Sequence, residues 1–268
     1  MKKLLAALLA LGMLFALCAC GNNDDGKGGL DDYLQDEVVI DYYVTDSGET
    51  FYFDAVDTES VTITDYRGSD VAHTLNIPAE INGKKVVAIA EGAFYYCSKI
   101  NAISFPASVT TIGKAAFAGC ALITNLQIPA TVTSIGEKAF YDCTGLREIV
   151  FENGSTLASI GDYAFGDCIL LRDVSIPASV KTIGSAAFKG CEALSEVVLA
   201  EGVETVGDGA FLNCTALSDL TLPASLTTIG KTAFSGSENL FLQGVTVPEG
   251  SVAEAYITAM KLADAPEA

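Results

Sequence analysis

The segment VTSIGEKAFYDCTGLREIVF, residues 132–151, shows a pattern that recurs along most of the chain. Each copy has a phenylalanine followed three residues later by a cysteine, and copies are 23 residues apart except for one interval of 25. The phenylalanines are Phe94, Phe117, Phe140, Phe165, Phe188, Phe211 and Phe234; the cysteines are Cys97, Cys120, Cys143, Cys168, Cys191 and Cys214, with Ser237 in the seventh copy. A fixed period of about 20 to 50 residues is typical of a solenoid, in which each repeat buries its apolar face against its neighbours.

Each copy also contains an alternating segment that predicts a β-strand. Apolar residues stand three, six and eight positions after the cysteine, as with Leu146, Ile149 and Phe151. Such alternation is expected of a strand with one buried face. A proline commonly ends the strand, and a second apolar pair follows, such as Val180 and Ile183. A glycine comes next, where we expect a turn to need its permissive backbone. These glycines are Gly113, Gly136, Gly161, Gly184, Gly207 and Gly230, with Ala90 in the first copy.

The two ends of the array differ from its repeats. Residues 37–85 hold short runs of β-branched and aromatic residues, which predict a β-rich N-terminal cap with a degenerate first repeat. Seven repeats then occupy residues 86–250. Such a cap is expected because an open solenoid end exposes core and strand edges.

Residues 251–268 predict a C-terminal capping helix and tail. Ser251 and Glu254 form a capping box, in which the glutamate reaches back to the serine amide. The helix is expected to run from Val252 to about Leu262, with Val252, Tyr256 and either Ala259 or Met260 facing the last coil.

The N-terminus predicts export and anchoring. Two lysines precede an apolar run at residues 4–17, which is typical of a signal peptide and too short for an ordinary membrane-spanning helix. The segment LCACG at residues 17–21 resembles a bacterial lipobox. We therefore expect a lipoprotein signal peptide at 1–19, a lipidated Cys20, and a flexible tether at 20–36 rich in glycine and aspartate. An ordinary signal peptide remains the alternative.

Charge narrows the range of partners. The chain has 34 acidic and 15 basic residues, for a net charge of −19. Nucleic-acid binding draws its affinity from lysine and arginine, so this balance argues against it. An acidic surface instead favours solubility, cations or basic partners.

The repeat unit I-G-x-x-A-F-x-x-C-x-x-L-x-x-V-x-I-P resembles the BspA-like bacterial leucine-rich repeats over about residues 86–248. The resemblance implies a right-handed parallel solenoid with one β-sheet, and short turns or helical segments on the other side. It also implies a surface-exposed protein attached to the bacterial cell, and an adhesive role towards host or matrix proteins.

The residue types that carry chemistry form no catalytic, cofactor or metal pattern. The array cysteines lack the close spacing of metal ligands, and we interpret them as buried free thiols, with disulfides between neighbouring coils as the alternative. The one histidine, His73, falls in the cap outside any recognisable catalytic constellation. The sequence therefore predicts a non-enzymatic protein without cofactor.

The outward face of the strands is the candidate site. Five residues after the cysteines, parallel strands in register would place four carboxylates in a row about 5 Å apart, beside two arginines. The candidate partner-binding residues are Asn125, Arg147, Glu148, Arg172, Asp173, Glu196 and Asp219. A solvated face, a contact surface for a basic protein and a Ca²⁺ site all remain open.

Two functions follow from these observations. The first is a cell-surface lipoprotein whose solenoid binds a protein or other macromolecule, as in adhesion. The alternative is a structural or spacer protein of the cell envelope with no specific ligand.

Overall fold

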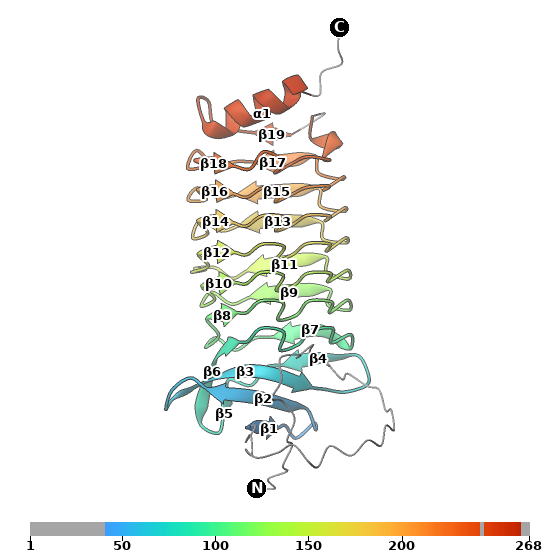
Figure 1. Cartoon of the computed structure of the whole chain (residues 1–268), viewed down its shortest axis with the longest axis vertical. Helices are drawn as coiled ribbons and strands as arrows, with labels where there is room; N and C mark the ends of the chain where they lie inside the picture. The colour runs from blue at the N-terminus through green and yellow to red at the C-terminus, as the bar shows by residue number, and fades with distance from the viewer. Residues whose placement is uncertain (1–40, 242–243, 264–268) are drawn as a thin grey trace, which may run out of the picture.

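The computed structural model describes residues 41–241 and 244–263. The expected signal peptide, Cys20, the tether and the first residues of the expected cap lie outside these ranges. The described chain winds through about eight turns that stack along one long axis, with the β-rich cap at one end and a helix at the other (Figure 1). The predicted solenoid is confirmed.

The longer strands form a parallel sheet along one side of the stack. Its strands are β9 (Asn125–Ile128), β11 (Glu148–Phe151), β13 (Asp173–Ile176), β15 (Glu196–Leu199), β17 (Asp219–Thr221) and β19 (Val245–Thr246). Consecutive coils supply neighbouring strands, and equivalent residues pair, as Ile149 does with Leu126. The repeat in the sequence is therefore a repeat in space.

A second sheet lies where turns or helical segments were expected. It contains the two-residue strands β8 (Thr111–Ile112), β10 (Ser134–Ile135), β12 (Ser159–Ile160), β14 (Thr182–Ile183), β16 (Thr205–Val206) and β18 (Thr228–Ile229), all parallel. In each, one residue is a serine or threonine that faces outward, and the other is an isoleucine or valine that faces the core. Strands this short give too little alternation to be recognised in the sequence.

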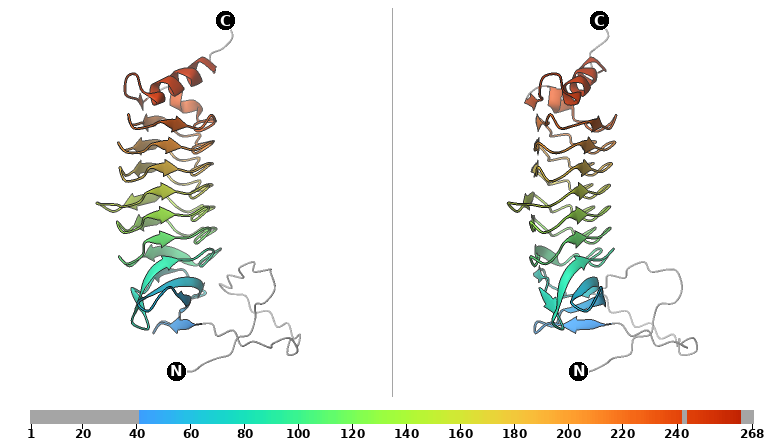
Figure 2. Two further views of the ribbon diagram at one scale, coloured as in Figure 1. Left: turned by 60° about the vertical axis from the view of Figure 1, so that its left-hand side comes forward. Right: turned by 90° about the vertical axis from the view of Figure 1, so that its left-hand side faces the viewer.

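The N-terminal cap extends the second sheet. Its strands are β1 (Tyr42–Val44), β2 (Thr50–Ala55), β3 (Ser60–Arg67), β4 (His73–Asn76), β5 (Glu80–Ile81) and β6 (Lys84–Ile89). The first three pair antiparallel, β3 pairs parallel with β6, and β6 pairs with β8 of the array. Strand β4 pairs with β7 (Ile100–Ser104). The longer cap strands cross the end of the stack (Figures 1 and 2) and so cover edges that would otherwise be open.

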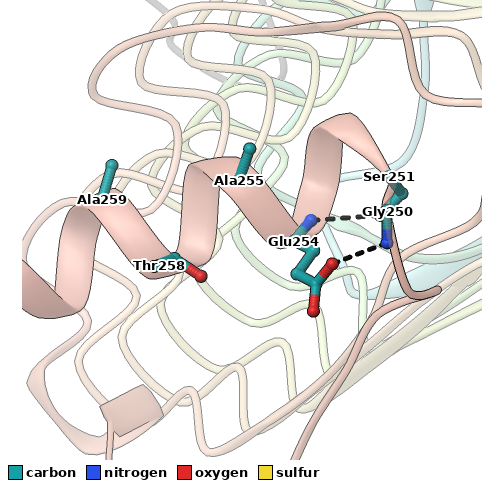
Figure 3. Close-up of a pocket in the computed structure, with 6 residues that line it drawn as sticks. All are labelled: Gly250, Ser251, Glu254, Ala255, Thr258 and Ala259. Carbon is teal, nitrogen blue, oxygen red and sulfur yellow. Dashed lines mark hydrogen bonds between the residues drawn. The ribbon is translucent and has the colours of Figure 1, made fainter.

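At the other end the chain passes through a 3₁₀ turn, η1 (Glu238–Phe241), and closes with helix α1 (Val252–Ala263). Figure 3 shows the start of α1, where the Glu254 amide donates to Ser251 Oγ at 3.1 Å. The Glu254 carboxylate accepts from the amide of Gly250 at 2.6 Å, one residue earlier than the capping-box prediction.

The buried face of α1 differs in part from the expectation. Val252 is 46% exposed, and the buried positions are Ala253 and Ile257. Tyr256 and Met260 do pack against the core, as expected. The buried stripe of the helix therefore starts one residue later than expected, at Ala253.

The seven repeat phenylalanines form one aromatic column. All are fully buried, and neighbouring rings are nearly parallel with centroids 4.8–5.3 Å apart. Parallel rings at this separation are offset, an arrangement that the ring quadrupole favours. Tyr66 packs on Phe94 at 5.1 Å and Tyr256 on Phe234 at 6.1 Å, so tyrosines of the cap and of α1 close the two ends.

The cysteines form a second column inside the coils. Cys143, Cys168, Cys191 and Cys214 are buried free thiols, which confirms the interpretation at these four positions, and Cys120 is buried beside them. Cys97 is buried too but is disulfide-bonded, so the free-thiol interpretation is wrong at that position. Each of the other five cysteines donates to the carbonyl oxygen of a phenylalanine in the preceding coil, at 3.1–3.3 Å. At the seventh position, Ser237 Oγ is buried and forms no such bond among the described residues.

These thiols are expected to be unreactive in the folded protein. Burial raises the pKa of Cys143 and of Cys214 to about 12, and that of Cys168 and Cys191 well above its ordinary value. Because the thiolate is the nucleophile, iodoacetamide at neutral pH should label these four residues only after unfolding. Mass spectrometry of protein labelled with and without guanidinium measures this; rapid labelling of Cys168 in the native protein would contradict it.

The repeat glycines serve close packing, not the turn conformation that was expected. None of the six has a positive φ. A Cβ built on Gly161 would lie 2.6 Å from the amide nitrogen of Glu137 in the preceding coil, and the other five show similar backbone clashes at 2.4–2.7 Å. Ala90 is accepted in the first copy because the cap strand β3, not another repeat turn, lies beneath it. Positive φ falls instead at two other positions of the coil, occupied for example by Ala115 and Asp142.

Candidate interaction surface

The predicted acidic residues come together on the outer face of the longer strands. Glu148 pairs in register with both Asn125 and Asp173, Asp173 pairs with Glu196, and Glu196 pairs with Asp219. All five side chains are exposed. Neighbouring parallel strands are about 4.8 Å apart, so four carboxylates and one amide follow one another along the stack. We call these five residues the acidic strip.

The strip is a place of unbalanced negative charge. Arg147 and Arg172 precede Glu148 and Asp173 and are exposed, but within the described ranges they form no salt bridge. The four salt bridges formed by described residues all lie elsewhere. Two unit charges about 5 Å apart interact by somewhat under 1 kcal/mol in water, so each neighbouring pair is mildly repulsive. A cationic partner would relieve this repulsion.

Hydroxyl groups position two of the four carboxylates. Ser195 Oγ donates to Asp173 Oδ1 at 3.3 Å, and Ser218 Oγ donates to Asp219 Oδ2 at 2.8 Å. Both serines stand four residues after a cysteine, in the same column as the two arginines. Neither serine was predicted as part of the site, although their shared position in the repeat was a usable signal.

A glutamate lies beside the strip where most repeats have proline. Glu152 Oε1 accepts from Gln127 Nε2 at 2.8 Å, and its Oε2 accepts from the amide of Ala130 at 3.1 Å. The two extra residues of this coil form an outward turn at Gly154, whose φ is 77°. This turn follows β11 and projects from the otherwise even stack (Figure 2).

The cap holds a partly buried polar network that the sequence did not reveal. The Tyr66 hydroxyl donates to Glu49 Oε1 at 2.6 Å and lies 2.9 Å from His73 Nε2, while His73 Nδ1 lies 2.9 Å from the carbonyl oxygen of Val71. His73 Nε2 and Glu49 Oε1 are 3.4 Å apart. Tyr66 follows Glu49 by 17 residues and precedes His73 by 7, a spacing that matches no recognised motif. Because Tyr66 is fully buried, the network satisfies a hydroxyl at the end of the aromatic column.

Neither a metal-binding cluster nor a membrane-spanning helix occurs among the described residues. Among residues 41–241 and 244–263, no group of three or more histidine, cysteine or acidic side chains is placed to hold a metal ion. Within the same ranges, no helix has both the length and the hydropathy needed to cross a bilayer. An open hollow lies on α1, lined by Gly250, Ser251, Glu254, Ala255, Thr258 and Ala259 (Figure 3).

Comparison with known proteins identifies the repeat. A family model for the BspA type leucine-rich repeat region matches residues 72–156 and 151–254. A leucine-rich repeat protein of T. pallidum is 32% identical, with a TM-score of 0.67, over 84% of this chain and 94% of that one. No curated protein matches the sequence.

Two further solved structures are longer than this chain. A leucine-rich repeat protein of Bacteroides ovatus is 30% identical with a TM-score of 0.64, over 81% of this chain and 53% of that one. A leucine-rich cell surface protein of Faecalibacterium prausnitzii is 29% identical with a TM-score of 0.65, over 76% of this chain and 54% of that one. The chain thus spans about half the length of these two proteins.

BspA-type repeat proteins are typically found at the cell surface or outside the cell, and their fold is typically non-enzymatic. The family match covers more than half of the residues, and the predicted resemblance is confirmed. The chain belongs to the BspA-type leucine-rich repeat family.

Proposed function

We propose that this protein is a cell-surface lipoprotein, held at the membrane through Cys20, that binds a basic surface of an extracellular or matrix protein through the acidic strip. The family suggests protein binding. The observation that supports this site is the register of Glu148, Asp173, Glu196 and Asp219, which sets four exposed carboxylates in one row.

The row suits a macromolecule better than a small ligand. It follows the long axis over four coils and is not enclosed, so a partner must span several strands to meet all four charges. Complementary charge raises association rates and selects among partners. Arg147 and Arg172, which form no salt bridge within the described chain, would add hydrogen-bond donors at the edge of the contact.

Charge reversal tests the strip. Changing Glu148, Asp173, Glu196 and Asp219 to lysine should weaken retention of the partner about tenfold or more, because attraction becomes repulsion at each contact. The soluble chain starting near Glu37 is used in pull-downs from host extracts and envelope fractions, and binding of the retained protein is then measured by calorimetry. Circular dichroism should show an unchanged fold.

The matched control reverses four exposed acids on the cap and first coil. The variant with Asp54, Glu59, Glu80 and Glu91 changed to lysine alters net charge by the same amount. It should retain binding. If both variants lose binding equally, overall charge and not the strip is responsible, and if neither does, the strip is not the site.

The anchor is tested separately. Cys20→Ala should release the protein from the membrane fraction into the medium, since a lipid chain on that thiol would be lost. Membrane retention of this variant would contradict the lipoprotein assignment. The alternative function, a spacer of the cell envelope without a ligand, is favoured if the soluble chain retains no specific protein from either extract.

A further inference from the structure

A second surface lies on the turns that precede the longer strands. Four tyrosines and two aspartates of the first four repeats meet there: Tyr95, Tyr96, Tyr141, Asp142, Tyr163 and Asp167. We call these six residues the tyrosine patch. Backbone bonds connect its coils, since the Tyr96 amide donates to Ala118 at 2.7 Å, Gly119 to Tyr141 at 2.8 Å, and Asp142 to Gly166 at 2.9 Å.

The rings rest on glycines and contact one another. Tyr95 and Tyr96 meet edge to face with centroids 4.5 Å apart, and Tyr141 and Tyr163 lie 6.4 Å apart. A Cβ built on Gly119 would lie 2.7 Å from Cδ1 of Tyr96, and one on Gly166 would lie 3.1 Å from Cδ2 of Tyr141. A side chain at position 119 would therefore clash with the ring of Tyr96, whereas one at position 166 would require the ring of Tyr141 to shift. Tyr96 remains 51% exposed, so much of its ring meets solvent.

Two of the tyrosines occupy strained backbone positions. Tyr96 and Tyr163 both have a φ of 54°, in the left-handed region that bulky residues avoid. At the position of Tyr96, the other six repeats have residues that tolerate this conformation: Gly119, Asp142, Asp167, Gly190, Asn213 and Gly236. The fold thus does not require an aromatic residue there and would be more stable without it. Strain of this kind is typical of residues kept for binding.

The patch attracts cations. The ammonium groups of Lys138 and Lys189 lie 5.7 Å and 5.9 Å from the ring centroid of Tyr163, within cation–π range. No lysine or arginine of the described chain lies over the ring of Tyr96. Hydrogen bonding to Asp167, then burial and nearby negative charge, raises the pKa of Tyr141 to about 12. This shift reflects the carboxylates of Asp167 and Asp142 near the Tyr141 ring.

We propose that the tyrosine patch binds an extended segment of a partner protein through its lysine or arginine side chains, with one cation over the ring of Tyr96 and beside Asp142. The exposed electron-rich ring, the carboxylate and the net charge of −19 all favour a cationic ligand. This surface does not depend on the acidic strip.

The test uses the full chain and a dye-labelled peptide of alternating arginine and glycine, titrated by fluorescence anisotropy at physiological salt. Tyr96→Gly should weaken binding about threefold to tenfold, as expected for loss of a cation–π contact. It should leave the unfolding midpoint unchanged or raise it, because glycine relieves the left-handed strain. A tyrosine kept only for folding would give the opposite result: lower stability and unchanged binding.

Two pairs of controls separate ring, local charge and overall charge. Tyr96→Phe keeps the ring and should bind within about twofold of wild type. Asp142→Asn should weaken binding, whereas Asp54→Asn, which changes net charge equally at an exposed position of the cap, should not. Equal loss in both aspartate variants, or full binding by Tyr96→Gly, overturns the proposal. Tyr96-dependent binding of a neutral oligosaccharide panel without binding of the peptide would overturn it in favour of a glycan.

Discussion

Phe165→Ala is expected to lower the free energy of unfolding by about 3–5 kcal/mol. The ring of Phe165 is fully buried between Phe140 and Phe188, with centroids 5.3 Å and 5.2 Å away. Removing it opens a cavity in the middle of the aromatic column, and backbone hydrogen bonds between coils prevent the neighbouring rings from closing the gap. Equilibrium denaturation in guanidinium measures the loss.

A matched variant separates volume from aromatic stacking. Phe165→Leu keeps most of the buried volume, so it should lower stability by less than half as much as alanine. Phe105 is partly buried and lies outside the column, with its ring centroid 5.6 Å from that of Phe117. Phe105→Ala should therefore also lower stability by less than Phe165→Ala. An alanine variant at 165 within 1 kcal/mol of wild type would mean that the column does not support the fold.

Gly161→Ala is expected to destabilise by about 3 kcal/mol, at the upper end of the range for overpacking. The added Cβ would meet the amide nitrogen of Glu137 and the carbonyl carbon of Gly136, each at 2.6 Å. These are backbone atoms of the preceding coil, and they cannot rotate away as a side chain can. The two coils must separate, which stretches the bond from the Gly161 amide to the carbonyl of Ile135, now 2.8 Å.

The control is the same substitution five residues later. A Cβ on Gly166 would lie 3.1 Å from Cδ2 of Tyr141, a side chain that can shift. Gly166→Ala should therefore lower the denaturation midpoint by much less than Gly161→Ala. If the two variants have equal effects, close approach of the coils is not the reason for the glycine at 161.

The fold could be predicted because every coil repeats the same solution. The recurring interval of 23 residues between phenylalanines was enough to expect the column. The alternation around Ile149 was enough to expect the sheet. The second sheet was missed because strands such as Ser159–Ile160 are too short for a period to show. The role of the repeat glycines was also misjudged, since the sequence shows that a small residue is needed but not which neighbour requires it.

The candidate site was predictable to the same extent. The register of Glu148 with Asp173 follows from the period alone, so the strip could be drawn before any coordinates were known. The tyrosine patch and the network of Glu49, Tyr66 and His73 could not. They depend on turns and on contacts between unlike segments, where neither a period nor a motif specifies which side chains meet.

Because the interfaces between coils are nearly identical, the length of the solenoid can change without altering them. Each inner ring meets the next at nearly the same distance, and each thiol meets the same carbonyl of the coil before it. Recombination between two repeats that adds or deletes one whole unit therefore creates a junction equivalent to those already present. Such events would lengthen or shorten the solenoid and the rows of exposed side chains on its strands. They would not require a new type of contact between coils.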